Sequence, residues 1–121
     1  MKLFVLGGSG FIGNELVQKV SSSNEVLATY NSHNLTKQNF LPVKFSFPEN
    51  FEILKKIIIK EQPDVIINLI ANTNLDYCEN NKKNVYELNV IFTEKICKLC
   101  NEINSKFIHI SSDYVFDGKN G

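Results

Sequence analysis

The 121-residue sequence contains no arginine, so all 13 of its basic side chains are lysines, and they balance 13 carboxylates. A phosphate bound by this chain must therefore be held by backbone N–H groups, hydroxyls, Asn or Lys, without a bidentate guanidinium. The formal net charge is zero and no block of like charge occurs, which argues against a nucleic-acid or membrane surface. No apolar run approaches the ~18 residues of a membrane span. Glycine also follows the first apolar run too early for a signal-peptide core.

Cysteine is also scarce, with three residues and no secretion signal, which predicts free thiols in a reducing cytosol and a cytoplasmic protein. Cys97 and Cys100 form a C-x-x-C pair inside a helical pattern, without a second pair at metal-ligand spacing. We interpret them as packing or surface thiols and predict no metal site. Asp76 and Glu79 could form an acid pair or bind a metal, but loop structure and helix-end capping are the favoured interpretation.

Apolar periodicity predicts one α/β domain over residues 1–121, with strands and helices in alternation. We expect strands at 2–6, 25–30, 43–47, 64–70 and 107–111. The helices are expected at 11–22, 49–62 and 82–104, and loops at 31–42 and 71–80. This alternation indicates a Rossmann-type, doubly wound parallel sheet with strand order 3-2-1-4-5. In such a sheet, ligands bind outside the carboxyl ends of the strands.

Three glycines, Gly7, Gly10 and Gly13, form G-x-x-G-x-x-G between the first strand and the first helix. Gly7 permits the tight turn, Gly10 lets the backbone approach a pyrophosphate at the helix start, and Gly13 lets helix and strand pack closely. The alternative is a tight turn that binds no ligand. In its position within the first βαβ unit, this loop predicts a dinucleotide site.

The residues after the second predicted strand bear on the choice of coenzyme. An acid there would bind the ribose 2′-OH of NAD, but this sequence has none. Asn31, Ser32, His33 or Lys37 could instead contact a 2′-phosphate. NADP(H) is therefore favoured, and NAD(H) remains open.

Further candidate residues follow the fourth and fifth predicted strands. Ala71 is small enough for a ligand to approach, and Asn72 offers hydrogen bonds. Asn89, a polar residue in the long helix, either bonds across to the sheet or is solvated. His109 alternates with isoleucines, so we interpret it as a core or under-helix residue.

The hydroxyls of Ser111 and Ser112 follow the fifth strand, beside the expected nicotinamide. There a hydroxyl can donate to a carbonyl oxygen as hydride arrives and stabilise the developing alkoxide.

Four segments together resemble the extended short-chain dehydrogenase/reductase family, and within it the dTDP-4-dehydrorhamnose reductase branch. They are GGSGFIG (7–13), PDVIINLIANTNLDYCE (63–79), VYELNV (85–90) and ISSDYVFDG (110–118). The resemblance implies that the pyrophosphate is bound by Gly7, Ser9, Gly10, Phe11, Ile12 and Gly13, that the ribose lies at Asn31 and Ser32, and that the adenine lies at Ser46 and Phe47. It implies that the rest of the cofactor is lined by Ala71, Asn72, Asn89 and Ser111. It also implies that Ser112 supplies the catalytic hydroxyl in place of the usual Thr, and that Tyr114 and Val115 lie on the substrate side. The family often has an Asp at the adenine, which this chain lacks.

The family's chemistry also needs a Tyr-x-x-x-Lys pair, and none of the four tyrosines here has Lys four positions on. We therefore expect an N-terminal fragment that contains the cofactor half, leaves the fifth strand exposed, and is inactive alone. The expected parent enzyme reduces the 4-keto group of a dTDP-4-dehydro-sugar, a small-molecule sugar nucleotide, and could form a homodimer. The alternatives are a non-catalytic NADP-binding regulator, like that of methionine adenosyltransferase, and another sugar-nucleotide epimerase or dehydratase of the extended family.

Overall fold

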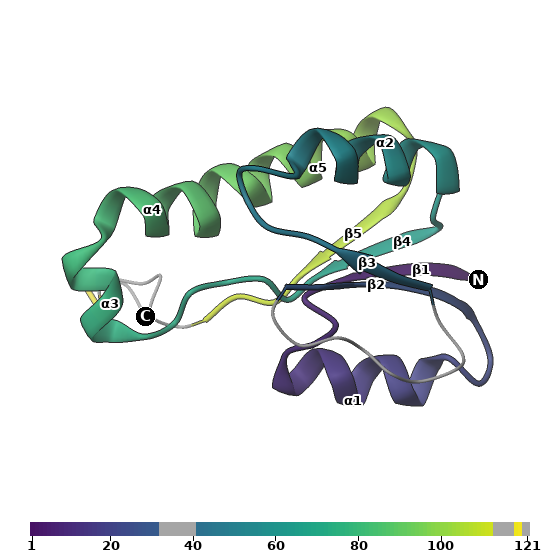
Figure 1. Ribbon diagram of the computed structural model, residues 1–121, viewed down its shortest axis with the longest axis horizontal. Coiled ribbons are helices and arrows are strands. Elements are labelled where there is room, and N and C mark those ends of the chain that lie inside the picture. Colours follow the sequence, from purple (N-terminus) through teal and green to yellow (C-terminus); the bar gives the residue numbers. More distant parts are fainter. Residues whose placement is uncertain (32–40, 113–117, 120–121) are drawn as a thin grey trace.

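A parallel β-sheet forms the centre of the computed structural model, which describes residues 1–31, 41–112 and 118–119 (Figure 1). Its strands lie in the order β3-β2-β1-β4-β5, so the predicted order is confirmed. The bounds are β1 Lys2–Leu6, β2 Glu25–Tyr30, β3 Leu41–Lys44, β4 Val65–Asn68 and β5 Lys106–His109. Because the order reverses between β1 and β4, the topological switch point lies between these two strands.

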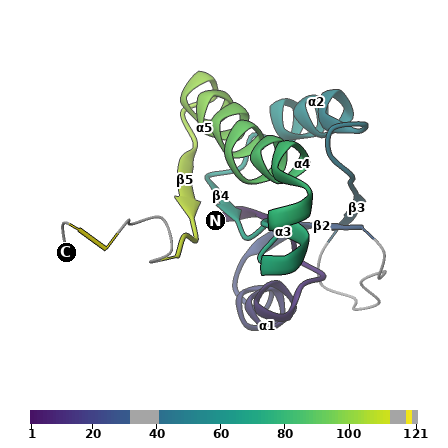
Figure 2. The same ribbon diagram turned by 90° about the vertical axis from the view of Figure 1, so that its left-hand side faces the viewer.

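Helices cover both faces of the sheet (Figures 1 and 2). Helix α1, Phe11–Val20, packs on one face, and α2, Phe51–Glu61, and α5, Phe92–Glu102, pack on the other. Two short helices, α3 Leu75–Asn80 and α4 Lys82–Tyr86, lead through the π-helical segment η1, Glu87–Ile91, into α5. None of the helices in the described part of the chain combines the length and apolar character needed to cross a membrane.

Strand alternation produces a separate core on each face. Along β1, Phe4 and Leu6 enter the core beneath α2 and α5, while Leu3 and Val5 face α1. Both faces of β1 are fully covered, which explains its uninterrupted apolar sequence.

The third strand begins and ends earlier than predicted. It pairs with β2 from Leu41, opposite Leu27, to Lys44, opposite Tyr30. Pro42 is tolerated within it because β3 is an edge strand. The chain leaves the sheet soon afterwards, since residues 46–50 form a turn in which the N–H of Asn50 donates to the Ser46 carbonyl oxygen at 2.9 Å.

The segment predicted as a loop at 71–80 contains helix α3. Its N-cap is Asn74, whose side-chain oxygen accepts the Tyr77 N–H at 2.8 Å. No residue of α3 is buried, so the sequence has no apolar stripe to mark the helix. The Asn80 and Asn81 amides donate to carbonyl oxygens of α3, so both cap its end.

The prediction that His109 is a core residue is wrong. Its side chain is exposed, stacks on Phe107 with 6.2 Å between ring centroids, and places Nδ1 3.2 Å from Asn68 Nδ2. The reason is that β5 is an edge strand, since Ile108 within it and Ile110 just after it are also 46% and 50% exposed. This exposure of the fifth strand agrees with the sequence-based expectation.

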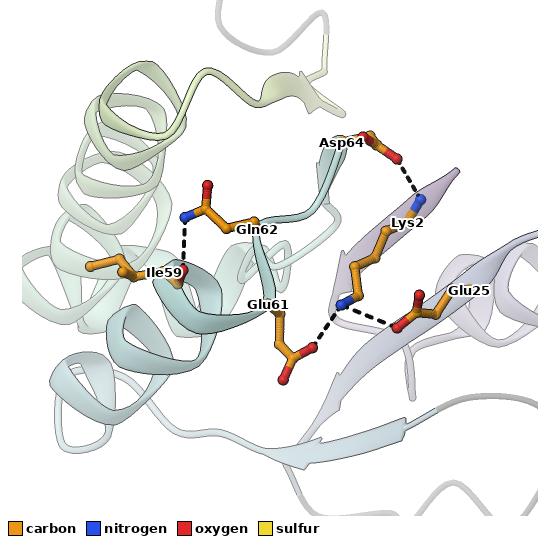
Figure 3. A network of polar contacts seen from close by, with 6 residues as sticks. All are labelled: Lys2, Glu25, Ile59, Glu61, Gln62 and Asp64. Atoms are coloured by element: carbon orange, nitrogen blue, oxygen red, sulfur yellow. Dashed lines mark hydrogen bonds and ion pairs between the residues drawn. The ribbon is translucent and has the colours of Figure 1, made fainter.

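A charged network joins the amino ends of β1 and β2 to the end of α2 (Figure 3). The Lys2 ammonium lies 2.8 Å from Glu61 and 3.1 Å from Glu25, and the Lys2 N–H donates to the Asp64 carboxylate at 2.6 Å. Gln62 ends α2 in the left-handed conformation, with its side chain bonded to the Ile59 carbonyl oxygen. This network lies at the edge of the sheet opposite the carboxyl ends of the strands.

Candidate functional site

The glycine loop connects β1 to α1 at the carboxyl edge of the sheet. Gly7 has φ +87°, and its carbonyl oxygen accepts the Gly10 N–H at 3.0 Å, which closes the turn. A Cβ on Gly13 would lie 2.1 Å from the Gly7 oxygen and 2.8 Å from the Gly8 Cα. The turn predicted at Gly7 is therefore present, and Gly13 lets α1 lie close to the backbone of Gly7 and Gly8, directly after β1.

Thr29 fixes the loop to the neighbouring strand. Its hydroxyl accepts the Gly7 N–H at 2.7 Å, and its side chain is buried at the end of β2. Thr29 was not predicted as a site residue, because it lies inside a strand pattern and not in the loop that follows. A buried hydroxyl among apolar strand residues is the signal that could have identified it.

The start of α1 favours an anion. Gly10 occupies the N-cap position and supplies no side-chain cap, and the first turn carries no acidic residue. The first backbone N–H groups of an α-helix have no intrahelical acceptor, and the helix dipole adds positive potential there. The Phe11, Ile12 and Gly13 amides are the groups in this position, and they could bind a phosphate without any arginine.

A cavity of about 180 Å³ opens beside this loop. It brings together five predicted site residues from the ends of three strands: Gly7, Ser9, Asn31, Ser46 and Phe47. Five others were not predicted: Thr29, Tyr30, Phe45, Ile70 and Leu88. The lining is aromatic and aliphatic with a few hydroxyl and amide groups, which suits a flat heterocycle and a ribose.

A second cavity, of about 410 Å³, adjoins the first. The two share Phe47 and Leu88, and the larger one also includes Pro48, Glu49, Asn72, Tyr77, Asn84, Val85 and Glu87. The Phe47 ring is held by aromatic contacts with Phe92 and Phe51, at 5.1 and 6.0 Å between centroids. It therefore forms a fixed wall between the two spaces.

Asn89 bonds across to the loop after β4, which was one of the two alternatives for this residue. Its side-chain oxygen accepts the Asn72 N–H at 2.8 Å, and its amide donates to the Asn72 carbonyl oxygen at 2.9 Å. Asn89 lies in η1, and the Thr93 hydroxyl bonds to its carbonyl oxygen. Buried Asn68 in turn donates to Thr93, so β4 and the π-helical turn share one polar network.

The remaining predicted site residues are less closely grouped. Ala71, Ser111 and Ser112 are exposed near the carboxyl ends of β4 and β5, and they line neither cavity. Ser32, Tyr114 and Val115 lie outside the described residues.

Cysteine and acidic side chains were the residues that the sequence offered as possible metal ligands. Within residues 1–31, 41–112 and 118–119, no group of three or more His, Cys, Asp or Glu is placed to hold a metal ion. Cys97 is exposed, whereas burial raises the pKa of Cys100 to about 11.

The sheet order, the glycine loop at the start of α1 and the cavity at the carboxyl edge define a Rossmann-type α/β protein. Over residues 1–121 the chain matches the family described as RmlD substrate binding domain, and it belongs to that family. The resemblance to extended short-chain dehydrogenases/reductases, and to the dTDP-4-dehydrorhamnose reductases among them, is confirmed.

Relatives of known sequence and structure agree with this membership. The chain is 34% identical to dTDP-4-dehydrorhamnose reductase of Escherichia coli and 32% identical to the spore coat polysaccharide biosynthesis protein SpsK of Bacillus subtilis. Each match covers 98% of this chain, but only 36% and 38% of the relative. The crystal structure of a hypothetical dTDP-4-dehydrorhamnose reductase from Sulfolobus tokodaii matches the whole chain with a TM-score of 0.88 and 38% identity, over 42% of its own length. The chain thus spans about two fifths of these proteins.

Proposed function

We propose that this chain is the coenzyme-binding part of an NAD(P)H-dependent enzyme that reduces the 4-keto group of a dTDP-4-dehydro-sugar. The observation that carries the proposal is the glycine loop, which opens onto an uncapped helix start and a partly apolar cavity in a chain of this family. Phosphate binding through backbone amides also suits a sequence that has no arginine.

Each part of the coenzyme has a candidate position. The amides of the glycine loop, from Gly7 through Gly13, would bind the diphosphate. Asn31, with Ser32, would contact the adenosine ribose, and Ser46 and Phe47 would contact the base. Ala71, Asn72, Asn89 and Ser111 would line the rest of the coenzyme. Because Tyr30 and Asn31 introduce no negative charge at the end of β2, a 2′-phosphate is tolerated and NADP(H) is favoured over NAD(H).

The chemical step divides between coenzyme and protein. Bound NAD(P)H supplies the hydride. The Ser112 hydroxyl would donate a hydrogen bond to the carbonyl oxygen that becomes an alkoxide, and Tyr114 and Val115 would lie on the substrate side. The chain contains no Tyr-x-x-x-Lys pair to supply the proton, so we expect these 121 residues to bind coenzyme without turnover.

Charge placed at the start of α1 tests the coenzyme site. Gly10 has φ −72° and ψ 170°, an extended conformation in which Asp or Asn can serve as N-cap. Gly10→Asp should lower the affinity for NADPH about tenfold or more relative to Gly10→Asn, because only Asp adds negative charge beside the diphosphate. Isothermal titration calorimetry measures the affinities, and thermal unfolding shows that both variants are folded. An affinity of Gly10→Asp for NADPH equal to that of the wild-type protein, or no binding of NADPH and NADH to the folded protein, would reject the site.

Turnover tests the catalytic assignment in the full-length protein. We expect it to consume NADPH with dTDP-4-dehydrorhamnose, and Ser112→Ala to lower kcat by about 10²-fold or more. Ser105→Ala is the matched control, since Ser105 precedes β5 at the opposite end of the strand. Unchanged turnover in Ser112→Ala would remove this residue from the mechanism.

A further inference from the structure

Asn68 is completely buried at the carboxyl end of β4, and its amide contacts three other segments of the chain. Its Oδ1 atom lies 3.0 Å from the backbone nitrogen of Ile70, in the loop that follows β4. Its Nδ2 atom lies 3.2 Å from Thr93 Oγ1 in α5 and 3.2 Å from His109 Nδ1 in β5. Buried amides are found with their donors and acceptors paired, so these contacts make Asn68 a junction between the sheet, the loop and α5.

The directions of these hydrogen bonds follow from the one partner that can only donate. The Ile70 N–H needs an acceptor, so Asn68 presents its oxygen to Ile70. The amino group of Asn68 then donates to both Thr93 Oγ1 and His109 Nδ1. The Thr93 hydroxyl donates its own hydrogen to the Asn89 carbonyl oxygen at 3.0 Å. An imidazole nitrogen that accepts carries no proton, so the neutral His109 ring has its proton on Nε2.

This chain of bonds ends on Asn89, in the π-helical segment η1. The Asn89 carbonyl oxygen accepts the Thr93 hydroxyl, while its side chain bonds to both the N–H and the carbonyl oxygen of Asn72, at 2.8 and 2.9 Å. A π-helical turn departs from α-helical geometry and is usually limited to a single turn, often at a functional site. The Asn72 N–H belongs to no helix or strand, so its hydrogen bond reports directly on where η1 holds the Asn89 side chain.

Residues of η1 and of the loop after β4 line the candidate site. Asn72, Glu87 and Leu88 line the larger cavity, and Leu88 lines the smaller one as well. Asn68 and Thr93 line neither cavity, so they can affect a ligand only through the residues that they hold. A displacement of η1 would therefore move walls of both cavities without removing any group that touches a ligand.

We propose that the side chains of Asn68 and Thr93 position the coenzyme site by holding Asn89 against the loop after β4. His109 joins the edge strand β5 to the same chain of bonds through its unprotonated Nδ1. The inference rests on the proposed function, which assigns Asn72 and Asn89 to the coenzyme. It goes beyond that function because it couples the exposed edge of the sheet to the walls of the site.

Amide hydrogen exchange followed by NMR tests the chain of bonds in the protein without ligand. Thr93→Val keeps the shape of the side chain but removes the hydroxyl, so Asn68 loses one acceptor and the Asn89 carbonyl oxygen loses a donor. We expect the Asn72 N–H to exchange about fivefold faster or more, the factor that corresponds to the loss of a typical hydrogen bond. The affinity for NADPH, measured by calorimetry, should fall by a similar factor of about five.

Two variants separate positioning from a general loss of stability. Thr93→Ser retains a hydroxyl and should restore both the slow exchange at Asn72 and the wild-type affinity. Ile96→Val removes one methylene group from a fully buried side chain of the same helix, so it lowers stability without removing any of these hydrogen bonds. Its NADPH affinity and its Asn72 exchange should both remain at the wild-type values.

The two ring nitrogens of His109 give a separate test of the bond directions. Their ¹⁵N chemical shifts distinguish the two neutral tautomers, and the proton should be found on Nε2. His109→Phe keeps a ring to stack on Phe107 but removes the acceptor, so Asn68 loses one partner. We expect Asn72 exchange in this variant to be faster than in the wild-type protein and slower than in Thr93→Val.

Unchanged Asn72 exchange in Thr93→Val, or a neutral His109 ring with its proton on Nδ1, would overturn the proposed chain of bonds. Faster exchange with unchanged NADPH affinity, or an equal loss of affinity in Ile96→Val, would overturn the positioning role while the coenzyme site stands. If the folded protein binds neither NADPH nor NADH, the proposed function fails, and the positioning of a coenzyme fails with it even where the exchange results hold.

Discussion

Substitution of Gly13 by alanine tests whether close packing, and not helix propensity, determines which residue is most stable at this position. Alanine is favoured over glycine by about 1 kcal/mol inside a helix, so propensity alone predicts a more stable protein. The new Cβ, however, would lie 2.1 Å from the Gly7 carbonyl oxygen, about 1.3 Å inside the 3.4 Å of ordinary contact. Both contacting groups, Gly7 and Gly8, are backbone, so α1 or the glycine loop must move as a unit.

Overpacking of this kind costs about 1–3 kcal/mol and occasionally more, and a clash with backbone belongs at the upper end. After the gain in propensity, we expect the free energy of unfolding to fall by about 2 kcal/mol and the Tm by about 10 °C. Urea denaturation and a thermal melt followed by circular dichroism measure both. Asn14→Ala is the control, because Asn14 is the next residue of α1 and is exposed. This substitution should be neutral or slightly stabilising. A Gly13→Ala protein as stable as Asn14→Ala would refute the packing argument.

Three further predictions concern single contacts. Thr29→Val should lower the free energy of unfolding by about 1–2 kcal/mol in urea denaturation, because the Gly7 N–H loses its acceptor. Thr29→Ser keeps a hydroxyl acceptor and should therefore keep most of the wild-type stability. The Lys2 ammonium lowers the pKa of Glu61, and Glu61 raises that of Lys2, so the stabilisation is present between about pH 4.5 and 10.5. It is lost as pH falls through the lowered carboxyl pKa or rises through the raised ammonium pKa, and Lys2→Met should flatten both changes in thermal melts across pH. Because burial raises the pKa of Cys100 to about 11, a thiol reagent at pH 8 should modify it only after unfolding, as mass spectrometry of labelled protein would show.

Strand order was predictable because the strands that determine it carry strong local signals. The buried runs in β1 and β4 are too apolar to lie anywhere except the middle of a covered sheet, and the glycine loop fixes where α1 begins. The edge elements were less predictable. Pro42 hides the start of β3, and α3 buries no residue, so no apolar periodicity marks it.

The same distinction applies to the candidate site. Asn31 was identified from its position after the second strand, and Ser9 from the resemblance of the glycine loop to that of the family. Thr29 and Phe45 line the same cavity but belong to or directly follow strands, where a sequence pattern gives them only a packing role. Asn89 lies in the π-helical turn and bonds to Asn72, 17 residues away, and no local pattern distinguished this contact from a solvated side chain.

Residues that stabilise the sheet and residues that form the candidate site lie at its opposite edges. The Lys2 network lies at the amino ends of the strands, whereas the glycine loop and both cavities lie at the carboxyl ends. Four to six residues of strand at about 3.3 Å each keep the two edges more than about 10 Å apart, beyond the range at which substitutions usually couple. Lys2→Met should therefore change the pH dependence of unfolding without changing coenzyme affinity at neutral pH. Thr29→Val should lower both the free energy of unfolding and the coenzyme affinity, because the hydroxyl of Thr29 both satisfies a backbone N–H and positions the glycine loop. A difference between these two variants thus distinguishes residues that only stabilise the sheet from those that also shape its site.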